Sequence, residues 1–84
     1  MDELTLALEQ AQRQQRLPPP AERRRLRRRA GLSQVIIGRA LGVSGVTISR
    51  WESGARTPSR CRAPLYADVL ERLAREAANG GGAA

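Results

Sequence analysis

The stretch SQVIIGRALGVSGVTISRWESG, residues 33–54, constrains the fold more than any other part of the chain. Its apolar residues recur at helical spacing, so each of two short segments directs one stripe of side chains toward a shared core. The apolar residues are Ile37, Leu41, Val43, Ile48 and Trp51. Ser33 and Ser44 each precede one segment and are suited to cap a helix N-terminus. The pattern predicts two short helices joined by a tight turn.

Two glycines support this prediction. Gly42 lies between the segments, where one helix must end and another start at a steep angle. A left-handed residue favours such a turn, and glycine adopts that conformation at the least cost. Gly38 lies where the two helices are expected to cross, and a missing side chain there allows a close approach of the backbones. Together these features predict a helix-turn-helix.

The second predicted helix has two chemically different faces. A rotation of roughly 100° per residue places Thr47, Ile48 and Trp51 on one side, which we expect to face the core. The opposite side carries Gly45, Val46, Ser49 and Arg50. This second face is small, polar and basic, which suits a helix that lies in the major groove of DNA.

Residues 24–58 resemble the DNA-binding domains of the Cro and phage-repressor (XRE-type) helix-turn-helix family. The resemblance is carried by LRRRAGLSQ, by the glycine of the turn, and by ISRWESG with the Thr57 and Pro58 that follow it. It implies an all-α fold, a small helical bundle of the phage-repressor DNA-binding type. This chain adds an extra N-terminal helix to that plan. The partner that the resemblance implies is double-stranded DNA.

The resemblance and the helix faces together assign candidate contacts to DNA. Base contacts are expected from Gly45, Val46, Ser49 and Arg50. Phosphate contacts are expected from Gln34, Ser44, Thr47, Arg56 and Arg60. Arg50 is the only long donor on the base-facing side, so it is the candidate for recognising a G·C pair. The resemblance also implies a largely buried ion pair between Arg27 and Glu52, with an architectural role.

The rest of the chain divides by composition into three parts. Residues 1–17 are expected to form an N-terminal helical appendage, ended by the prolines at 18–20. Residues 18–78 are expected to form the DNA-binding domain, and residues 79–84 a disordered tail. Flanking helices are expected over residues 21–30 and from about residue 64 to 78. The first is anchored by Leu26, and the second closes the core with Leu65, Val69, Leu70, Leu73 and Ala77.

Several positions leave alternatives open. The N-terminal helix carries only a thin stripe, Leu4 and Leu8, so it packs on the domain, pairs with another chain or frays. Val35 and Ile36 stand where relatives often have polar residues. They form either a docking patch for a protein partner or a surface that the N-terminal helix covers. Arg23 stands where relatives commonly have an aliphatic residue, which leaves the anchoring of its helix uncertain.

Composition limits the function classes. The formal net charge is +7 and all 15 basic residues are arginine, which favours a polyanionic partner. The chain has no histidine and a single cysteine, Cys61, so no familiar zinc cluster, cofactor site or activated nucleophile is expected. No apolar run has the length needed to span a bilayer, so we expect a cytoplasmic, nucleoid-associated protein that is not an enzyme.

The leading interpretation is a sequence-specific duplex-DNA-binding regulator of transcription, most simply a repressor that binds an inverted-repeat operator as a homodimer. Two alternatives remain open from the sequence. One is an antitoxin or adaptor whose protein partner binds Val35, Ile36 or the N-terminal helix, with DNA binding secondary. The other is an architectural DNA factor, which weak sequence preference and DNA bending would favour.

Overall fold

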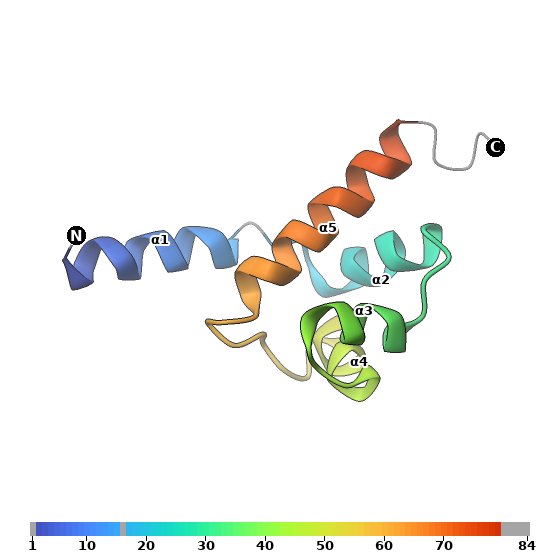
Figure 1. Cartoon of the computed structure of the whole chain (residues 1–84), viewed down its shortest axis with the longest axis horizontal. Coiled ribbons are helices and arrows are strands. Elements are labelled where there is room, and N and C mark those ends of the chain that lie inside the picture. Colours follow the sequence, from blue (N-terminus) through green and yellow to red (C-terminus); the bar gives the residue numbers. More distant parts are fainter. Residues whose placement is uncertain (1, 16, 80–84) are drawn as a thin grey trace.

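The computed structural model describes residues 2–15 and 17–79, with side chains described for residues 2–9 and 17–79. In this part the chain forms only helices, and the predicted all-α fold is confirmed. They are α1 (Glu3–Gln15), α2 (Pro20–Arg29), α3 (Gln34–Leu41), α4 (Gly45–Ser53) and α5 (Ala63–Ala78). Figure 1 shows α2 to α5 packed together, while α1 projects to one side.

A small apolar core joins the four packed helices. It consists of Leu26, Ile37, Leu41, Ile48, Trp51, Tyr66 and Leu70. The rings of Trp51 and Tyr66 lie with their centroids 5.0 Å apart and are tilted relative to each other, an arrangement that aromatic pairs favour. Every apolar position predicted for the motif faces this core, and Val43 packs against its edge. The core therefore fixes α4 from its inner side and leaves the outer side free.

The helix that precedes the motif starts at a proline. Pro20 occupies the first turn of α2, where its missing N–H has no helical acceptor and its fixed φ already suits a helix. The helix predicted over residues 21–30 therefore begins and ends one residue earlier. Leu26 is buried, as predicted, and is the only buried residue of α2. A single leucine thus anchors a helix whose other large side chains are mostly arginines.

The last helix turns the predicted face to the core except at Leu65. Leu70 is buried, and Val69 and Leu73 pack against the core cluster. Leu65 is 50 % exposed, so the prediction that it closes the core was wrong. The buried residues of α5 are Ala63, Tyr66, Ala67 and Leu70. At roughly 100° per residue, Leu65 lies almost opposite this stripe.

The N-terminal helix contacts α5 and leaves its leucines in solvent. Leu4 and Leu8 are both exposed, and Figure 1 shows α1 extending away from α3 and α4. Val35 and Ile36 are exposed as well. The interpretation that the N-terminal helix covers these two residues was therefore wrong. A helix with one thin apolar stripe has too little surface to bury against a domain of this size.

The C-terminal helix ends at Ala78, with Asn79 as its C-cap. Residues 80–84, most of the tail that we expected to be disordered, lie outside the described residues, as do residues 1 and 16. No helix in the described part combines the length and the apolar character that crossing a membrane requires.

Candidate nucleic-acid interface

Two serines begin the helices of the motif. Ser33 Oγ accepts a hydrogen bond from the backbone N–H of Ile36, and Ser44 Oγ accepts one from the backbone N–H of Thr47, each at 3.1 Å. Each bond satisfies one of the N–H groups that a helix N-terminus leaves without a partner. The hydroxyls of Ser44 and Thr47 also lie 3.1 Å apart. These caps set where α3 and α4 start, and so which side chains α4 presents outward.

Two glycines close the turn between α3 and α4. Gly42 has φ 73°, the left-handed conformation expected of it. A Cβ atom on Gly38 would lie 2.5 Å from the carbonyl oxygen of Val43 and 3.1 Å from the carbonyl carbon of Ser44. Gly38 therefore does allow a close approach, but the backbone that lies close to it is that of the turn, at Val43 and Ser44. Any side chain at Gly38 would push the turn, and α4 with it, away from α3.

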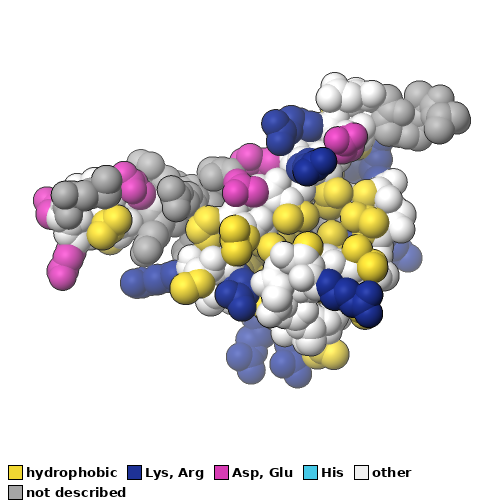
Figure 2. Space-filling model, viewed as in Figure 1, with side chains coloured by type: hydrophobic (Ala, Val, Ile, Leu, Met, Phe, Trp, Pro, Cys, Tyr) yellow, Lys and Arg dark blue, Asp and Glu magenta, His cyan; other side chains and the backbone are white. Residues whose placement is uncertain are grey.

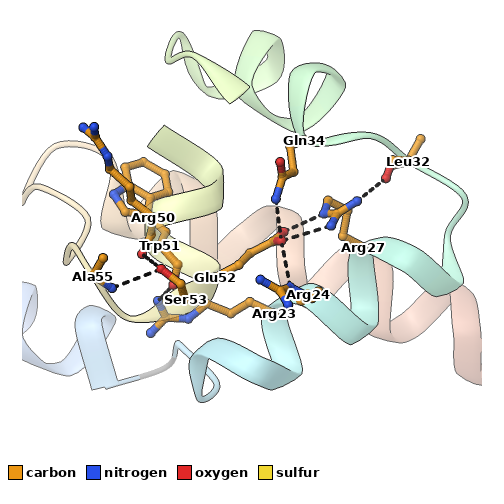
Figure 3. A network of polar contacts seen from close by, with 10 residues as sticks. All are labelled: Arg23, Arg24, Arg27, Leu32, Gln34, Arg50, Trp51, Glu52, Ser53 and Ala55. Atoms are coloured by element: carbon orange, nitrogen blue, oxygen red, sulfur yellow. Dashed lines mark hydrogen bonds and ion pairs between the residues drawn. The ribbon is translucent and has the colours of Figure 1, made fainter. Parts of the chain in front are cut away.

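A buried carboxylate ties α4 to α2 and α3 (Figure 3). Glu52, near the end of α4, is 3 % exposed. Arg27 donates two hydrogen bonds to it, from Nε to Oε2 at 2.6 Å and from Nη2 to Oε1 at 3.0 Å. Arg24 Nε lies 3.6 Å from Oε1. Arg27 also donates from Nη1 to the backbone carbonyl of Leu32 at 2.9 Å, which fixes the segment that leads into α3.

The amide of Gln34 joins the same network. Its Nε2 donates to Glu52 Oε1 at 3.1 Å. The sequence analysis assigned Gln34 to phosphate contact. The observed bond supports α4, and phosphate contact stays a prediction. Gln34 thereby connects the first residue of α3 to the last turn of α4.

The partners of Glu52 determine its charge state. Burial alone raises the pKa of a carboxyl group, because a charged group is poorly solvated inside a protein. Hydrogen bonds from Arg27 and Gln34, together with the charges of Arg27 and Arg24, outweigh burial, so the pKa of Glu52 lies below its ordinary value. Glu52 is therefore ionised at neutral pH, and the geometry is that of a bidentate ion pair.

Arg23 has a structural role that the sequence analysis missed. Its Nε donates to the Pro18 carbonyl at 2.7 Å and its Nη1 to the Trp51 carbonyl at 3.1 Å. Its guanidinium carbon lies 6.0 Å from the centroid of the Tyr66 ring, within cation–π range. An arginine thus replaces the expected aliphatic side chain and holds the last turn of α4. The sequence did contain an indication of this role, because Arg23 stands three residues before Leu26 and so lies on the inner side of α2.

The exposed side of α4 carries the residues that we assigned to base contact. Val46 and Arg50 are exposed, while Gly45 and Ser49 are partly buried. In Figure 3 the Arg50 side chain points away from the Glu52 network. A groove of about 460 Å³ lies between α4 and the following loop, and Thr47, Arg50 and Arg56 all line it. The fold therefore brings candidates from the helix and the loop to one surface, while Arg60 is exposed farther along the loop.

Arg62 differs from the other loop arginines. It is half-buried, its Nε is buried, and its Nη2 donates to the carbonyl of Gly42 at 3.5 Å. It therefore lies across the turn of the motif and holds the loop against it, whereas Arg56 and Arg60 extend into solvent.

Charge is distributed unevenly over the molecule. Residues 33–62 contain five arginines and a single acidic residue, Glu52, which is buried. The other acidic residues lie at or in α1, in α2 and in α5: Asp2, Glu3, Glu9, Glu22, Asp68, Glu71 and Glu76. In Figure 2 acidic side chains gather over α1 and α5, and arginines border the part formed by α3 and α4. The exposed charges of the motif are therefore all positive, which favours a polyanion.

A family model described as a helix-turn-helix domain matches residues 21–78. The chain belongs to the helix-turn-helix domain family. No curated protein and no solved structure matched the chain. A helix-turn-helix domain implies DNA binding. Among the described residues, no cluster of acidic or cysteine side chains suits a metal ion.

Proposed function

We propose that this helix-turn-helix protein is a sequence-specific, duplex-DNA-binding regulator of transcription, most simply a repressor. The observation that carries the proposal is the charge of the motif surface, where Arg50, Arg56 and Arg60 are exposed and the only acid is buried. A protein bound at a promoter blocks that promoter by its presence alone and needs no additional binding surface. Repression is therefore the simplest regulatory outcome for a domain of this size.

In the proposed complex, α4 lies in the major groove with its N-terminal residues at the base edges. Gly45, Val46, Ser49 and Arg50 contact bases, with Arg50 on guanine and Val46 on a thymine methyl group. Phosphates on either side are held by Gln34, Ser44, Thr47, Arg56 and Arg60. The ion pair of Arg27 with Glu52 keeps α4 at a constant angle to the rest of the domain.

Duplex affinity is expected to fall steeply with salt, because neutralised phosphates release their condensed counterions. If about five phosphates are neutralised, a plot of log K against log salt has a slope of about −4 to −5. Fluorescence anisotropy with a labelled duplex at several salt concentrations measures the slope. A slope near zero would remove DNA binding from the account.

Replacement of Arg50 and replacement of Arg56 are expected to have different effects on DNA binding. Arg50→Ala should cost about 1 to 3 kcal/mol of binding free energy and relax base preference at one position, because a bidentate contact to guanine is lost. Arg56→Ala should weaken binding to all sequences alike and reduce the salt slope by about one. Selection from randomised duplexes separates the two effects. An Arg50→Ala protein that keeps the parent consensus would show that Arg50 contacts only phosphate.

The functional unit on DNA is expected to be a homodimer on an inverted repeat. One recognition helix contacts only a few base pairs, and two copies multiply the discrimination. Half-sites centred about 10 base pairs apart place both helices on one side of the duplex. The candidate pairing surfaces are the exposed Leu4 and Leu8 of α1 and the exposed Val35 and Ile36 of α3. Sedimentation of the protein alone and on its operator measures the stoichiometry.

One protein per duplex at saturation, on a site without two-fold symmetry, would contradict the dimer. Deleting residues 1–16 then tests the surface. Loss of pairing with intact half-site binding would assign pairing to α1, whereas loss of folding would show that α1 belongs to the core.

A second candidate function is a protein-interaction module, such as an antitoxin or adaptor. The observation that favours it is the exposure of Val35 and Ile36 on α3 and of Leu4 and Leu8 on α1. A partner protein that binds these residues more tightly than the duplex binds α4 would support this function over the first.

A further inference from the structure

The first residue of the recognition helix leaves a space that a side chain of α3 fills. A Cβ atom on Gly45 would lie 3.1 Å from Cγ2 of Val35 and 3.3 Å from its backbone nitrogen. Val35 therefore stands directly against the start of α4, where a longer residue at position 45 would otherwise direct its own side chain. In this chain the contact surface at the N-terminal end of α4 comes partly from α3.

Two exposed valines border this point. Val35 is 51 % exposed and Val46, the residue after Gly45, is 60 % exposed. Neither belongs to the core cluster or packs against it. Their exposed methyl groups lie at the end of α4 that we propose enters the major groove first. These two side chains can make a favourable contact with DNA only where the DNA presents an apolar group.

Duplex DNA offers few apolar groups to such a surface. The phosphates are charged, and the major-groove edges of the bases carry hydrogen-bond donors and acceptors, except for the C5-methyl group of thymine. A methyl group at C5 of cytosine occupies the same place in the groove. Apolar contact with these methyl groups is therefore the favourable interaction available to Val35 and Val46 on a duplex.

We propose that Val35 and Val46 form, on the two sides of Gly45, a subsite for the C5-methyl groups of pyrimidines in the major groove. Val35 is then a specificity-determining residue supplied by α3, and the half-site carries methylated pyrimidines under the N-terminal end of α4. The inference rests on the proposed function, because it specifies the DNA sequence that α4 recognises. It also assigns Val35 to the DNA surface and not to a protein-docking patch.

The experiment starts from a half-site selected with the unaltered protein from randomised duplexes. Each thymine of that site is then replaced by uracil, which removes one methyl group and leaves base pairing unchanged. Affinity should fall about fourfold for each methyl that contacts the subsite, as expected for burial of one methylene-sized group. A duplex with C·G at the same position, with and without a 5-methyl group on cytosine, distinguishes thymine from 5-methylcytosine as the natural ligand.

Two variants connect the effect to the residues. Val35→Ala should lose about fourfold in affinity on the thymine duplex and much less on the uracil duplex. Ile36→Ala is the matched control, because Ile36 is the adjacent apolar residue, 44 % exposed, and no Ile36 atom is among the nearest contacts of the Gly45 position. It should bind both duplexes like the unaltered protein. Circular dichroism checks that both variants are folded.

Equal binding of the thymine and uracil duplexes would overturn the inference, and so would a Val35→Ala loss of the same size on both. A protein partner that competes with DNA and loses affinity for the Val35→Ala variant, with methyl dependence absent, would also overturn it in favour of docking. All these outcomes leave the proposed function standing. Failure of the unaltered protein to bind any duplex would instead remove the proposed function itself.

Discussion

Replacing Glu52 by alanine is expected to lower the free energy of unfolding by about 3 to 5 kcal/mol, and Arg27→Ala should have an effect of similar size. Either change leaves the other charge in the interior without its partner, since the exposed fractions of the two side chains are 1 % for Glu52 and 13 % for Arg27. Glu52→Ala also releases Gln34, so the polar contacts of both Arg27 and Gln34 with the end of α4 are lost. Urea or thermal unfolding measures the loss.

The chain provides a matched control in the pair of Glu22 and Arg25. It is also bidentate but lies on the surface of α2, where an ion pair contributes between about 0 and 1 kcal/mol. Arg25→Ala should therefore melt close to the unaltered protein. A double-mutant cycle on Arg27 and Glu52 measures the coupling between them. A cycle without coupling would show that burial, and not the ion pair, determines the cost of each change.

The same pair predicts a pH dependence with a definite sign. Because the pKa of Glu52 is lowered in the folded protein, its contribution is fully present above the unfolded glutamate pKa of about 4.3 and is lost as the pH falls through the lower folded pKa. As the pH falls, the free energy of unfolding should therefore decrease less for the Glu52→Gln variant than for the unaltered protein. Urea midpoints at pH 6 and pH 3 test this, and an identical decrease in both proteins would contradict it.

Gly38→Ala is expected to destabilise the protein by about 3 kcal/mol, the upper part of the range for overpacking. The new Cβ would lie 2.5 Å from the Val43 carbonyl oxygen, and a backbone atom cannot move without moving the turn. Elsewhere in a helix this substitution stabilises by roughly 0.5 to 1 kcal/mol, so the expected sign is opposite to helix propensity. DNA affinity should fall as well, because α4 would be displaced.

Gly45→Ala is the control for this prediction. A Cβ atom on Gly45 would lie 3.1 Å from Val35 Cγ2 and 3.3 Å from the Val35 backbone nitrogen, so its closest backbone contact is 0.8 Å longer than the 2.5 Å contact at Gly38. We expect a change in the free energy of unfolding within about 1 kcal/mol, an ordinary value for a single substitution. A stabilising Gly38→Ala would show that the turn adjusts freely and that the close approach has no energetic role.

The motif was predictable because several independent signals coincide within residues 33–54. Helical periodicity located the buried side chains, serines marked the helix starts, and Gly42 marked the turn. Local rules of this kind depend only on neighbouring residues, so they transfer from sequence to structure. The Arg27 contact with Glu52 is not local, since it joins α2 to α4. Only the resemblance to a known family implied it.

The predictions that were wrong depend on competition between side chains for the core. Leu65 was assigned to the core because it is apolar, although at roughly 100° per residue it lies away from the centre of the stripe that includes Tyr66 and Leu70. The ring of Tyr66 packs against the ring of Trp51 in a tilted arrangement. Burial of the Tyr66 hydroxyl is the main cause that raises its pKa to about 12, and the negative charge of Glu52 acts in the same direction. Arg23 was missed for a related reason, because its long side chain covers that ring while its charge reaches backbone carbonyls.

The surface properties of α1 and α3 were beyond prediction for a different reason. Val35 and Ile36 were recognised as unusual, but periodicity cannot say whether another helix covers them. The direction in which α1 leaves the prolines at 18–20 decides this, and that direction depends on the contact of α1 with α5. Exposed apolar residues on two separate helices are therefore visible only once the helices are placed in space.

The central claim is that the outer face of α4, with the start of α3 and the loop after α4, is the surface that binds duplex DNA. Amide chemical shifts of ¹⁵N-labelled protein, followed while a selected duplex is added, test this residue by residue. The account predicts that the largest shifts occur in residues 33–35, 44–50 and 54–62, and that the exposed side of α5 around Leu65 and Asp68 stays nearly unchanged. Shifts concentrated on α1 and α5, with α4 unaffected at saturating duplex, would contradict it.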